Sequence, residues 1–185
     1  MRSADGRRRT IVRLGHPVLR QRAEEVPAER FGTRFLRDLG RDLVRTMFED
    51  NGVGLAAPQI AVPVRVFAYY LPREGAVEEI PPRVLVNPVL TLEGQATEPG
   101  WEGCLSVPGL RGIVPRHARI TVSAVDVDGV PVSFQAEGFH ARVIQHEFDH
   151  LDGIVFLDRM TDLSSLAYEE ELEHHASEHE VPLEA

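Results

Sequence analysis

The sequence contains no lysine and only one cysteine, Cys104, among its 185 residues. A single cysteine excludes a disulfide within the chain and is typical of a reducing compartment. The formal net charge is −9 at pH 7, whereas binding to nucleic acid or to an anionic membrane requires a basic face. No apolar run reaches the ~20 residues of a membrane span, and no signal-peptide segment follows the basic N-terminus. We therefore expect a cytoplasmic protein that binds neither nucleic acid nor membrane.

The overall composition and the length of the chain indicate one globular domain. Apolar residues make up 43% of the chain and charged residues 26%, which is ordinary for a folded protein. The length suits one hydrophobic core, and no repeat or linker divides it. We expect a loose leader over residues 1–9, one catalytic domain over residues 10–175 and an acidic tail over residues 176–185.

Hydrophobic periodicity predicts helices at both ends of the chain and strands between them. Apolar residues recur at helical spacing over residues 33–50 and 138–152, and a third, strongly acidic helix is expected over residues 163–175. β-Branched and aromatic residues between Pro and Gly breakers indicate strands over residues 64–70, 83–92, 118–127 and 130–134. Asp128-Gly129 is a hairpin turn signal. The class is α+β: a single domain with antiparallel or mixed sheets packed around the 138–152 helix, flanked by an N-terminal and a C-terminal helix.

The predicted helix over residues 138–152 carries an HExxH motif, His146 to His150. Two histidines four residues apart project from one face of a helix, so both imidazoles can reach one metal ion. Glu147 lies beside them and is placed to take a proton from water bound to that ion. A five-residue pattern also arises by chance, so a catalytic site needs a third ligand.

Three sources of that ligand can be compared. A third histidine six residues after the motif is excluded, because that position holds Phe156. A glutamate about twenty residues beyond the motif would suit a thermolysin-like peptidase, and Glu169, Glu170 and Glu171 lie in that range. We favour a solvated acidic helix face for these three. Cys104 would complete a Cys-His-His site with one position open, the arrangement of catalytic metal centres.

Two further segments are unusual in composition. Gly103 precedes Cys104 and Pro108 follows it, which favours a sharply positioned loop over a regular strand. The small residues of Gly52–Gln59 allow backbone to approach a ligand or another strand closely. This second segment is not a phosphate loop, because it lacks the Lys-Ser/Thr ending.

These three segments, in this order and at these separations, resemble the signature motifs of the peptide deformylases. The segments are residues 52–59, 102–106 and 146–150, and the resemblance covers roughly residues 10 to 160. One departure is Ala61, where family members often carry glycine. The resemblance implies a hydrolase that removes the N-formyl group from the formyl-methionine of nascent chains, yielding formate and a free amine.

The resemblance also implies a role for individual residues. Cys104, His146 and His150 would hold the ion and a water, and Glu147 would act as general base. The Gln59 amide and the Leu105 backbone N–H would stabilise the oxyanion. The residues expected to bind or shape the pocket for an extended peptide are Gly52, Val53, Gly54, Glu102, Gly103 and Arg111.

The identity of the ion is less constrained by the residues. A thiolate ligand favours softer or redox-active metals. The resemblance implies Fe(II) as the native ion, with Zn, Ni or Co able to replace it. The expected partners are N-formylmethionyl peptides, encountered at the ribosome or elsewhere, and we expect a monomer.

Overall fold

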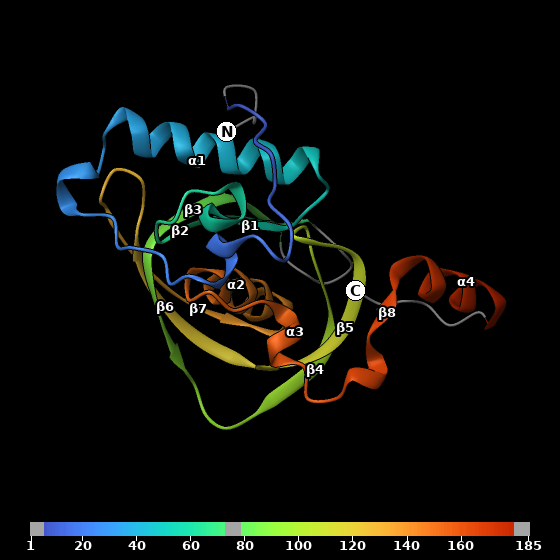
Figure 1. Cartoon of the computed structure of the whole chain (residues 1–185). Coiled ribbons are helices and arrows are strands. Elements are labelled where there is room, and N and C mark those ends of the chain that lie inside the picture. The colour runs from blue at the N-terminus through green and yellow to red at the C-terminus, as the bar shows by residue number, and fades with distance from the viewer. Residues whose placement is uncertain (1–5, 73–78, 180–185) are drawn as a thin grey trace.

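Two antiparallel sheets form the framework of the protein (Figure 1). The computed structural model describes residues 6–72 and 79–179, and the side chains of 175–179 lie outside that description. The larger sheet has the order β1-β2-β3-β6-β7, with strands Gly54–Ala56, Val66–Leu71, Ile80–Leu92, Arg119–Val125 and Pro131–Glu137. The smaller sheet has the order β4-β5-β8, with strands Thr97–Cys104, Val107–His117 and Ala167–Tyr168.

Four α-helices and several 3-10 turns are described beside the sheets. The α-helices are α1 (Arg34–Glu49), α2 (Gly138–Leu151), α3 (Phe156–Arg159) and α4 (Glu169–His179). The 3-10 turns are η2 (Pro17–Arg20), η3 (Ala28–Arg30), η4 (Ala57–Ile60) and η5 (Leu163–Ser165). Among the described residues, no helix combines the length and the apolarity that crossing a bilayer requires.

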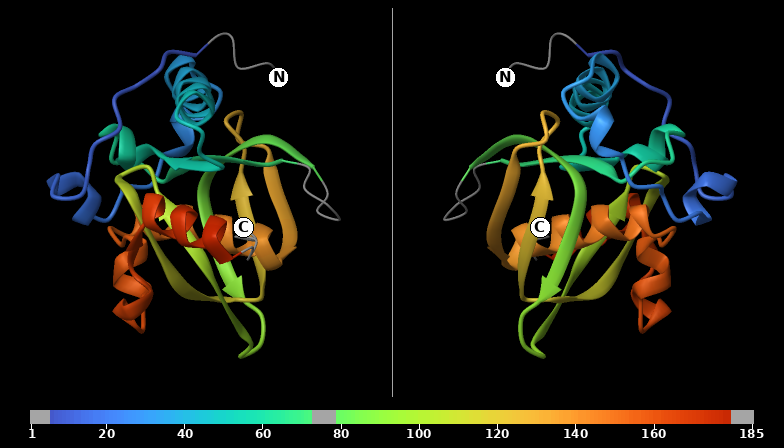
Figure 2. Two further views of the ribbon diagram at one scale, coloured as in Figure 1. Left: turned by 90° about the vertical axis from the view of Figure 1, so that its right-hand side faces the viewer. Right: turned by 90° about the vertical axis from the view of Figure 1, so that its left-hand side faces the viewer.

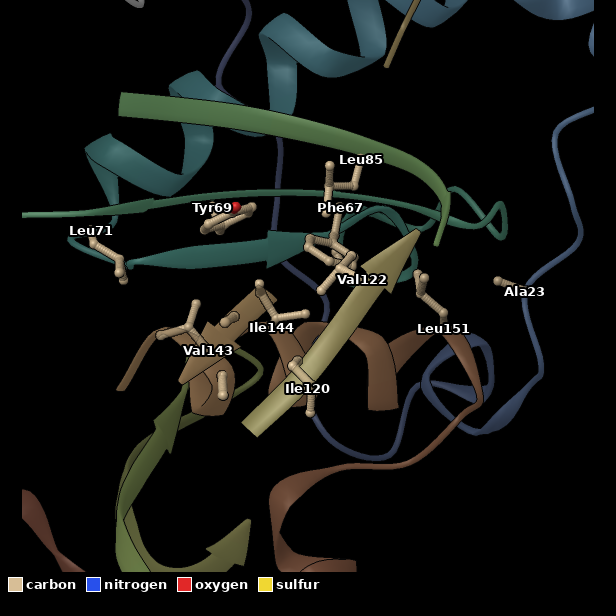
Figure 3. Close-up of a cluster of buried hydrophobic side chains, with 13 residues drawn as sticks. Ala23, Phe67, Tyr69, Leu71, Leu85, Ile120, Val122, Val143, Ile144 and Leu151 are labelled. Atoms are coloured by element: carbon tan, nitrogen blue, oxygen red, sulfur yellow. The ribbon is translucent and has the colours of Figure 1, made fainter. Parts of the chain in front are cut away.

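The larger sheet is covered by α1 on one face and by α2 on the other (Figures 1 and 2). Strand β2 shows why, because successive side chains of a strand point to opposite faces. Val66 and Ala68 pack in the cluster beneath α1, whereas Phe67 and Tyr69 pack in the cluster beside α2. Figure 3 shows Phe67 and Tyr69 on the side of the sheet that faces Ile144 of α2. Burying a side chain such as Val66, Phe67 or Ile144 contributes about 1.5–3 kcal/mol, so the helix that carries the HExxH motif is fixed in the core.

The predicted ends of α1 and the predicted hairpin are confirmed. The Thr33 hydroxyl accepts from the Leu36 N–H at 3.5 Å and caps α1, and Asn51 takes a left-handed φ of 57° just after it. Between β6 and β7, the Asp126 carboxylate accepts from two backbone N–H groups, and Gly129 has a φ of 85°. The α+β class with antiparallel sheets around α2 is also confirmed.

Two predictions of local structure were wrong. The segment around Cys104 is not a loop: residues 97–117 form the β4–β5 hairpin, with Gly103 opposite Arg111. Pairing along the hairpin outweighs its many Pro and Gly residues. The predicted helix over 163–175 is confirmed only from Glu169, where α4 begins; before it the chain forms η5 and β8. Here Ala167 pairs with Arg111, and this long-range pairing overrides the local helical pattern.

The described part of the expected leader, residues 6–9, is hydrogen-bonded to helix α1. The Arg7 N–H donates to Asp42 Oδ1 at 2.7 Å, and the Arg9 N–H donates to Thr46 Oγ1 at 2.9 Å. Residues 1–5 and 180–185 lie outside the described residues, so the expected ends of the leader and of the tail lie there too.

Candidate active site

Helix α2 brings two histidines and one glutamate to the same buried place. His146 and His150 are one turn apart, with ring centroids 5.0 Å from each other. His150 is 1% exposed and Glu147 is 4% exposed. The helix can bury these polar groups because the apolar residues of its other positions pack against the larger sheet.

Cys104 approaches the two histidines from the end of β4. Its Sγ lies 3.3 Å from His150 Nε2. One ligand atom from each of Cys104, His146 and His150 lies within 4.8 Å of the others. This is the group of metal-binding donors that the described part of the chain contains, and the glutamates of α4 are not in it. The alternative of a thermolysin-like third ligand from residues 169–171 is therefore not supported by the structure.

The charges of this group suit a divalent cation. Burial opposes the Cys104 thiolate, but the neighbouring His150 and His146 outweigh burial and lower the pKa of the thiol well below its usual value. The thiolate is the form that binds a metal. His150 Nδ1 is buried without a hydrogen-bond partner among the described residues. Three converging donors, one of them anionic, fit a catalytic ion with an open coordination position.

Glu102 contacts the Nδ1 side of the His146 ring and fixes the orientation of that ring. Its Oε2 lies 2.9 Å from His146 Nδ1, which leaves Nε2 of the ring as the metal-binding nitrogen. Arg116 donates to both Glu102 oxygens, at 2.8 and 2.9 Å, and Arg142 donates to Oε1 at 3.0 Å. Glu102 is 5% exposed. Both carboxylate oxygens are thus engaged by these partners, and the residue also lines the pocket, which it was expected to bind or shape.

The ion-pair network continues into α2. Arg116 Nη1 donates to Asp149 Oδ2 at 2.6 Å, and Arg159 Nη2 donates to Asp149 Oδ1 at 2.7 Å. Arg142 also donates to the carbonyls of Gly100, Val114 and Glu98. Such buried charges are tolerated because each is paired and hydrogen-bonded. The network connects α2 to the β4–β5 hairpin and so fixes Cys104 relative to the histidines.

Glu147 lies directly against β1, and a glycine makes this contact feasible. A Cβ added at Gly54 would lie 2.2 Å from Glu147 Oε1. Glu147 Oε2 is buried without a hydrogen-bond partner among the described residues. Burial raises the pKa of the Glu147 carboxyl to about 7, against the opposing effect of His146 and His150. A carboxylate with a free oxygen next to the metal donors is suited to moving a proton.

Gln59 reaches the same place from η4. Its Oε1 accepts from the Ala56 N–H at 2.8 Å, which orients the amide. The Nε2 then lies 3.2 Å from Ser106 Oγ and 3.5 Å from Cys104 Sγ. An amide donor held beside the metal donors is placed to stabilise negative charge on a reacting oxygen.

These groups line one pocket of about 960 Å³. Its walls come from the N-terminal segment, the turn after α1, the β4–β5 hairpin, α2 and the start of α4. Apart from His150, which lies behind the wall, every residue selected from the sequence lines this pocket: Gln59, Cys104, Leu105, His146, Glu147, Gly52, Val53, Gly54, Glu102, Gly103 and Arg111. Arg111 faces Glu169 of α4, with Nη1 3.7 Å from Oε1.

Several contributors were missed from the sequence. Arg116 and Asp149 join the network behind His146, and Trp101 and Phe139 line the pocket. Asp149 stands inside the HExxH motif, and polar residues within a predicted buried helix were an available signal. Arg142 was also missed, and it pairs with Glu102 in the same network. Nothing in the local sequence indicated that Arg116 faces Glu102.

Comparisons with known proteins agree on the family. The family model of polypeptide deformylase matches residues 8–165. Peptide deformylase 1 of Nitrosomonas europaea is 44% identical over 165 residues, which cover 88% of this chain and 93% of that protein. The structure of a class I type b peptide deformylase from Acinetobacter baumannii with Met-Ala-Ser bound has a TM-score of 0.79 and 35% identity, covering 83% of this chain and 99% of that one. For the peptide deformylase of Thermotoga maritima the values are 0.75, 35%, 84% and 99%.

Proposed function

This chain belongs to the polypeptide deformylase family, enzymes that remove the N-formyl group from nascent polypeptides, and we propose that it does so at the pocket between α2 and the β4–β5 hairpin. The observation that carries this assignment is the convergence of Cys104, His146 and His150 within 4.8 Å. Glu147 and Gln59 lie beside them in the same pocket. Ligands for a metal ion, a general base and an amide donor for the oxyanion are the groups that metal-assisted hydrolysis of a formamide uses.

Cys104, His146 and His150 would hold one divalent ion. When bound, the ion supplies a Lewis acid that makes water a competent nucleophile at neutral pH. We propose Fe(II) as the native ion, as the resemblance to the deformylases implies; a thiolate beside two imidazoles suits Fe(II) and zinc better than hard metals such as magnesium or calcium. Metal analysis of anaerobically purified protein tests this, and zinc as the ion bound by the active enzyme would contradict it.

The chain's own residues supply the remaining steps. Glu147 takes a proton from the attacking water at its free Oε2 and passes it to the leaving amine. The Gln59 Nε2 and the Leu105 N–H donate hydrogen bonds to the formyl oxygen, which becomes negatively charged when water attacks the formyl carbon. The bond between the formyl carbon and the amine nitrogen breaks, and formate and a free N-terminus are released. The walls formed by Gly52–Gly54 and Gly103 would pair with the extended peptide.

Formate release from formyl-Met-Ala-Ser by anaerobically purified, Fe(II)-loaded protein tests the assignment. Cys104→Ala should lose both bound metal and turnover. Glu147→Gln should keep the metal and lower turnover at least 100-fold, in the range that general-base removal costs. Turnover that survives Glu147→Gln would remove Glu147 from the mechanism. Folded, metal-loaded wild-type protein without turnover would mean that this scaffold has a different use.

The working context follows from the substrate. We propose that the enzyme acts as a monomer in the cytoplasm, where formylated chains are made, and meets them at or near the ribosome. Light scattering tests the monomer, and co-sedimentation with ribosomes that carry formylated chains tests the association.

A further inference from the structure

The outer part of the pocket is built from two segments that are distant in sequence. One wall is the N-terminal segment, held by the Val12 N–H donating to the Gln59 carbonyl and the Leu14 N–H donating to the Ser106 carbonyl, both at 2.8 Å. The other wall is the hairpin residue Arg111 together with Glu169 of α4. Glu169 lies beyond residues 8–165, the part of the chain that the family model matches.

Glu169 is held at this position by backbone pairing. Strand β8 pairs with β5, with Ala167 opposite Arg111 and Tyr168 opposite Leu110. Glu169 follows directly as the first residue of α4. Its Oε1 lies 3.7 Å from Arg111 Nη1, and its side chain remains 51% exposed. The ladder thus presents this carboxylate at the pocket wall and leaves it accessible to a bound peptide.

The other carboxylates that line the pocket are already engaged. Asp50 binds Arg8 at 2.6 Å. Glu102 is buried in the network behind His146, and Glu147 is buried beside β1. Glu169 is thus the lining carboxylate with a single, long ion pair and an exposed side chain.

The arginines of the pocket wall differ in whether a carboxylate pairs with them. Arg8 and Arg9 are paired with Asp50 and Asp42. The Arg13 side chain also lines the pocket and makes no hydrogen bond or ion pair with the residues that the structure describes. Glu169 therefore offsets Arg111, and removing its charge would leave Arg111 and Arg13 as two uncompensated cations.

We propose that Glu169 is a specificity residue of the deformylase reaction: it favours formylated peptides with Lys or Arg downstream of formyl-methionine and disfavours those with Asp or Glu. The proposal rests on the proposed function of this pocket. It places charge discrimination in the C-terminal segment, at a residue that takes no part in the chemical step. The effect acts on peptide binding and so on KM.

The test measures kcat and KM on formyl-Met tetrapeptides in which position two, three or four is Lys, Gln or Glu and the others are Ala. Glu169→Gln should lower kcat/KM for the Lys peptide and raise it for the Glu peptide, each roughly two- to fivefold at low salt, as expected for partly exposed charges. The change should appear in KM at one position and leave the Gln peptide unaffected. It should disappear at 1 M salt, where the Debye length is about 3 Å.

Two variants serve as controls. Glu170→Gln removes the same charge from the next residue of α4, which is exposed and does not line the pocket, so it should leave the preference nearly unchanged. Glu169→Asp keeps the charge and should keep the preference. A loosened α4 would change all three peptides in the same direction, whereas the proposal requires opposite signs for Lys and Glu.

The outcomes distinguish a failure of the specificity role of Glu169 from a failure of the proposed function. Equal shifts in Glu169→Gln and Glu170→Gln would reduce the effect to net charge and overturn the proposal. Turnover of the Gln peptide with an unaltered Lys-to-Glu ratio in Glu169→Gln would also overturn it, while leaving the proposed function intact. Failure of the wild-type enzyme to deformylate the Gln peptide would refute the proposed function itself, and the specificity role with it.

Discussion

Replacing Gly54 with alanine is the sharpest perturbation of the proposed catalytic geometry. The added Cβ would lie 2.2 Å from Oε1, 2.6 Å from Cδ and 2.8 Å from Cγ of Glu147. Carbon atoms pack favourably at about 3.5–4.0 Å, so the carboxylate must move by more than ~1 Å. Glu147 is 4% exposed, and the open space beside it is the pocket that it lines. The substitution therefore displaces the proposed base without changing its chemistry.

Both activity and stability should respond. A displacement of about 1 Å in a reacting group can cost about 100-fold in rate, and overpacking a buried site costs about 1–3 kcal/mol. We expect Gly54→Ala to bind metal as the wild type does, to unfold at lower urea, and to release formate about 100-fold more slowly. Gly103→Ala is the matched control for stability, because its added Cβ would lie 3.6 Å from the nearest atom.

A double-mutant cycle isolates the contact. In a Glu147→Ala background the atoms that clash with the new Cβ are gone, so Gly54→Ala should cost little further stability. The coupling free energy between the two sites, measured by urea unfolding, should approach the whole cost of the single substitution. If Gly54→Ala destabilises the protein equally in both backgrounds, the cost lies elsewhere in β1, and the packing of Glu147 against Gly54 is not what requires glycine there.

Three further predictions concern the polar network and the core. Glu102→Gln should weaken metal affinity roughly 10–100-fold by freeing the His146 ring; unchanged affinity in a chelator competition would show that this hydrogen bond does not orient the ligand. Arg116→Met removes the cation shared by two buried carboxylates, Glu102 and Asp149, which keep Arg142 and Arg159 as partners. The free energy of unfolding in urea should fall by at most about 3–5 kcal/mol, the cost of breaking a buried ion pair completely, and a loss below ~1 kcal/mol would contradict a contribution of Arg116 to this network. Burial, with the nearby Arg83 charge, lowers the pKa of His140 from 6.5 to about 4. As the pH falls, the unfolded chain therefore takes up this proton before the folded chain does. The free energy of unfolding should be highest above pH 6.5 and should decrease as the pH falls from about 6.5 to about 4. Discounted for partial exposure, this loss is about 1–2 kcal/mol and should be absent from His140→Gln; parallel pH profiles of the two proteins would refute it.

The sequence alone determined the elements whose information is local. The apolar spacing of residues 33–50 and 138–152 predicted α1 and α2, because a helix is formed by contacts within a few residues. The same periodicity placed His146 and His150 on one face. The three motif segments then pointed to the family, and the comparisons bear this out. Asp128-Gly129 specified its hairpin for the same reason, since a tight turn depends on its own residues.

The tertiary structure decided what depends on partners far along the chain. The β4–β5 hairpin contains too many Pro and Gly residues to look like strands, and it forms because its two halves pair with each other and because Arg116 and Arg142 anchor it to α2 through Glu102 and Asp149. The resemblance implied that Glu102 binds the peptide or shapes the pocket, and only the structure shows that its carboxylate contacts Arg116, Arg142 and His146. Those partners lie 14, 40 and 44 residues away.

The position of Glu169 shows the same limit. In the sequence it is one of three consecutive glutamates, and a solvated helix face was the favoured interpretation. Only the pairing of β8 with β5 distinguishes it, by bringing it to Arg111 at the pocket wall while Glu170 stays outside. Local sequence fixes which residues can form a helix or hold a metal ion, because those properties belong to neighbouring side chains. Which of the three glutamates lines the pocket depends on strand pairing between distant segments, and that pairing exists only in the folded chain.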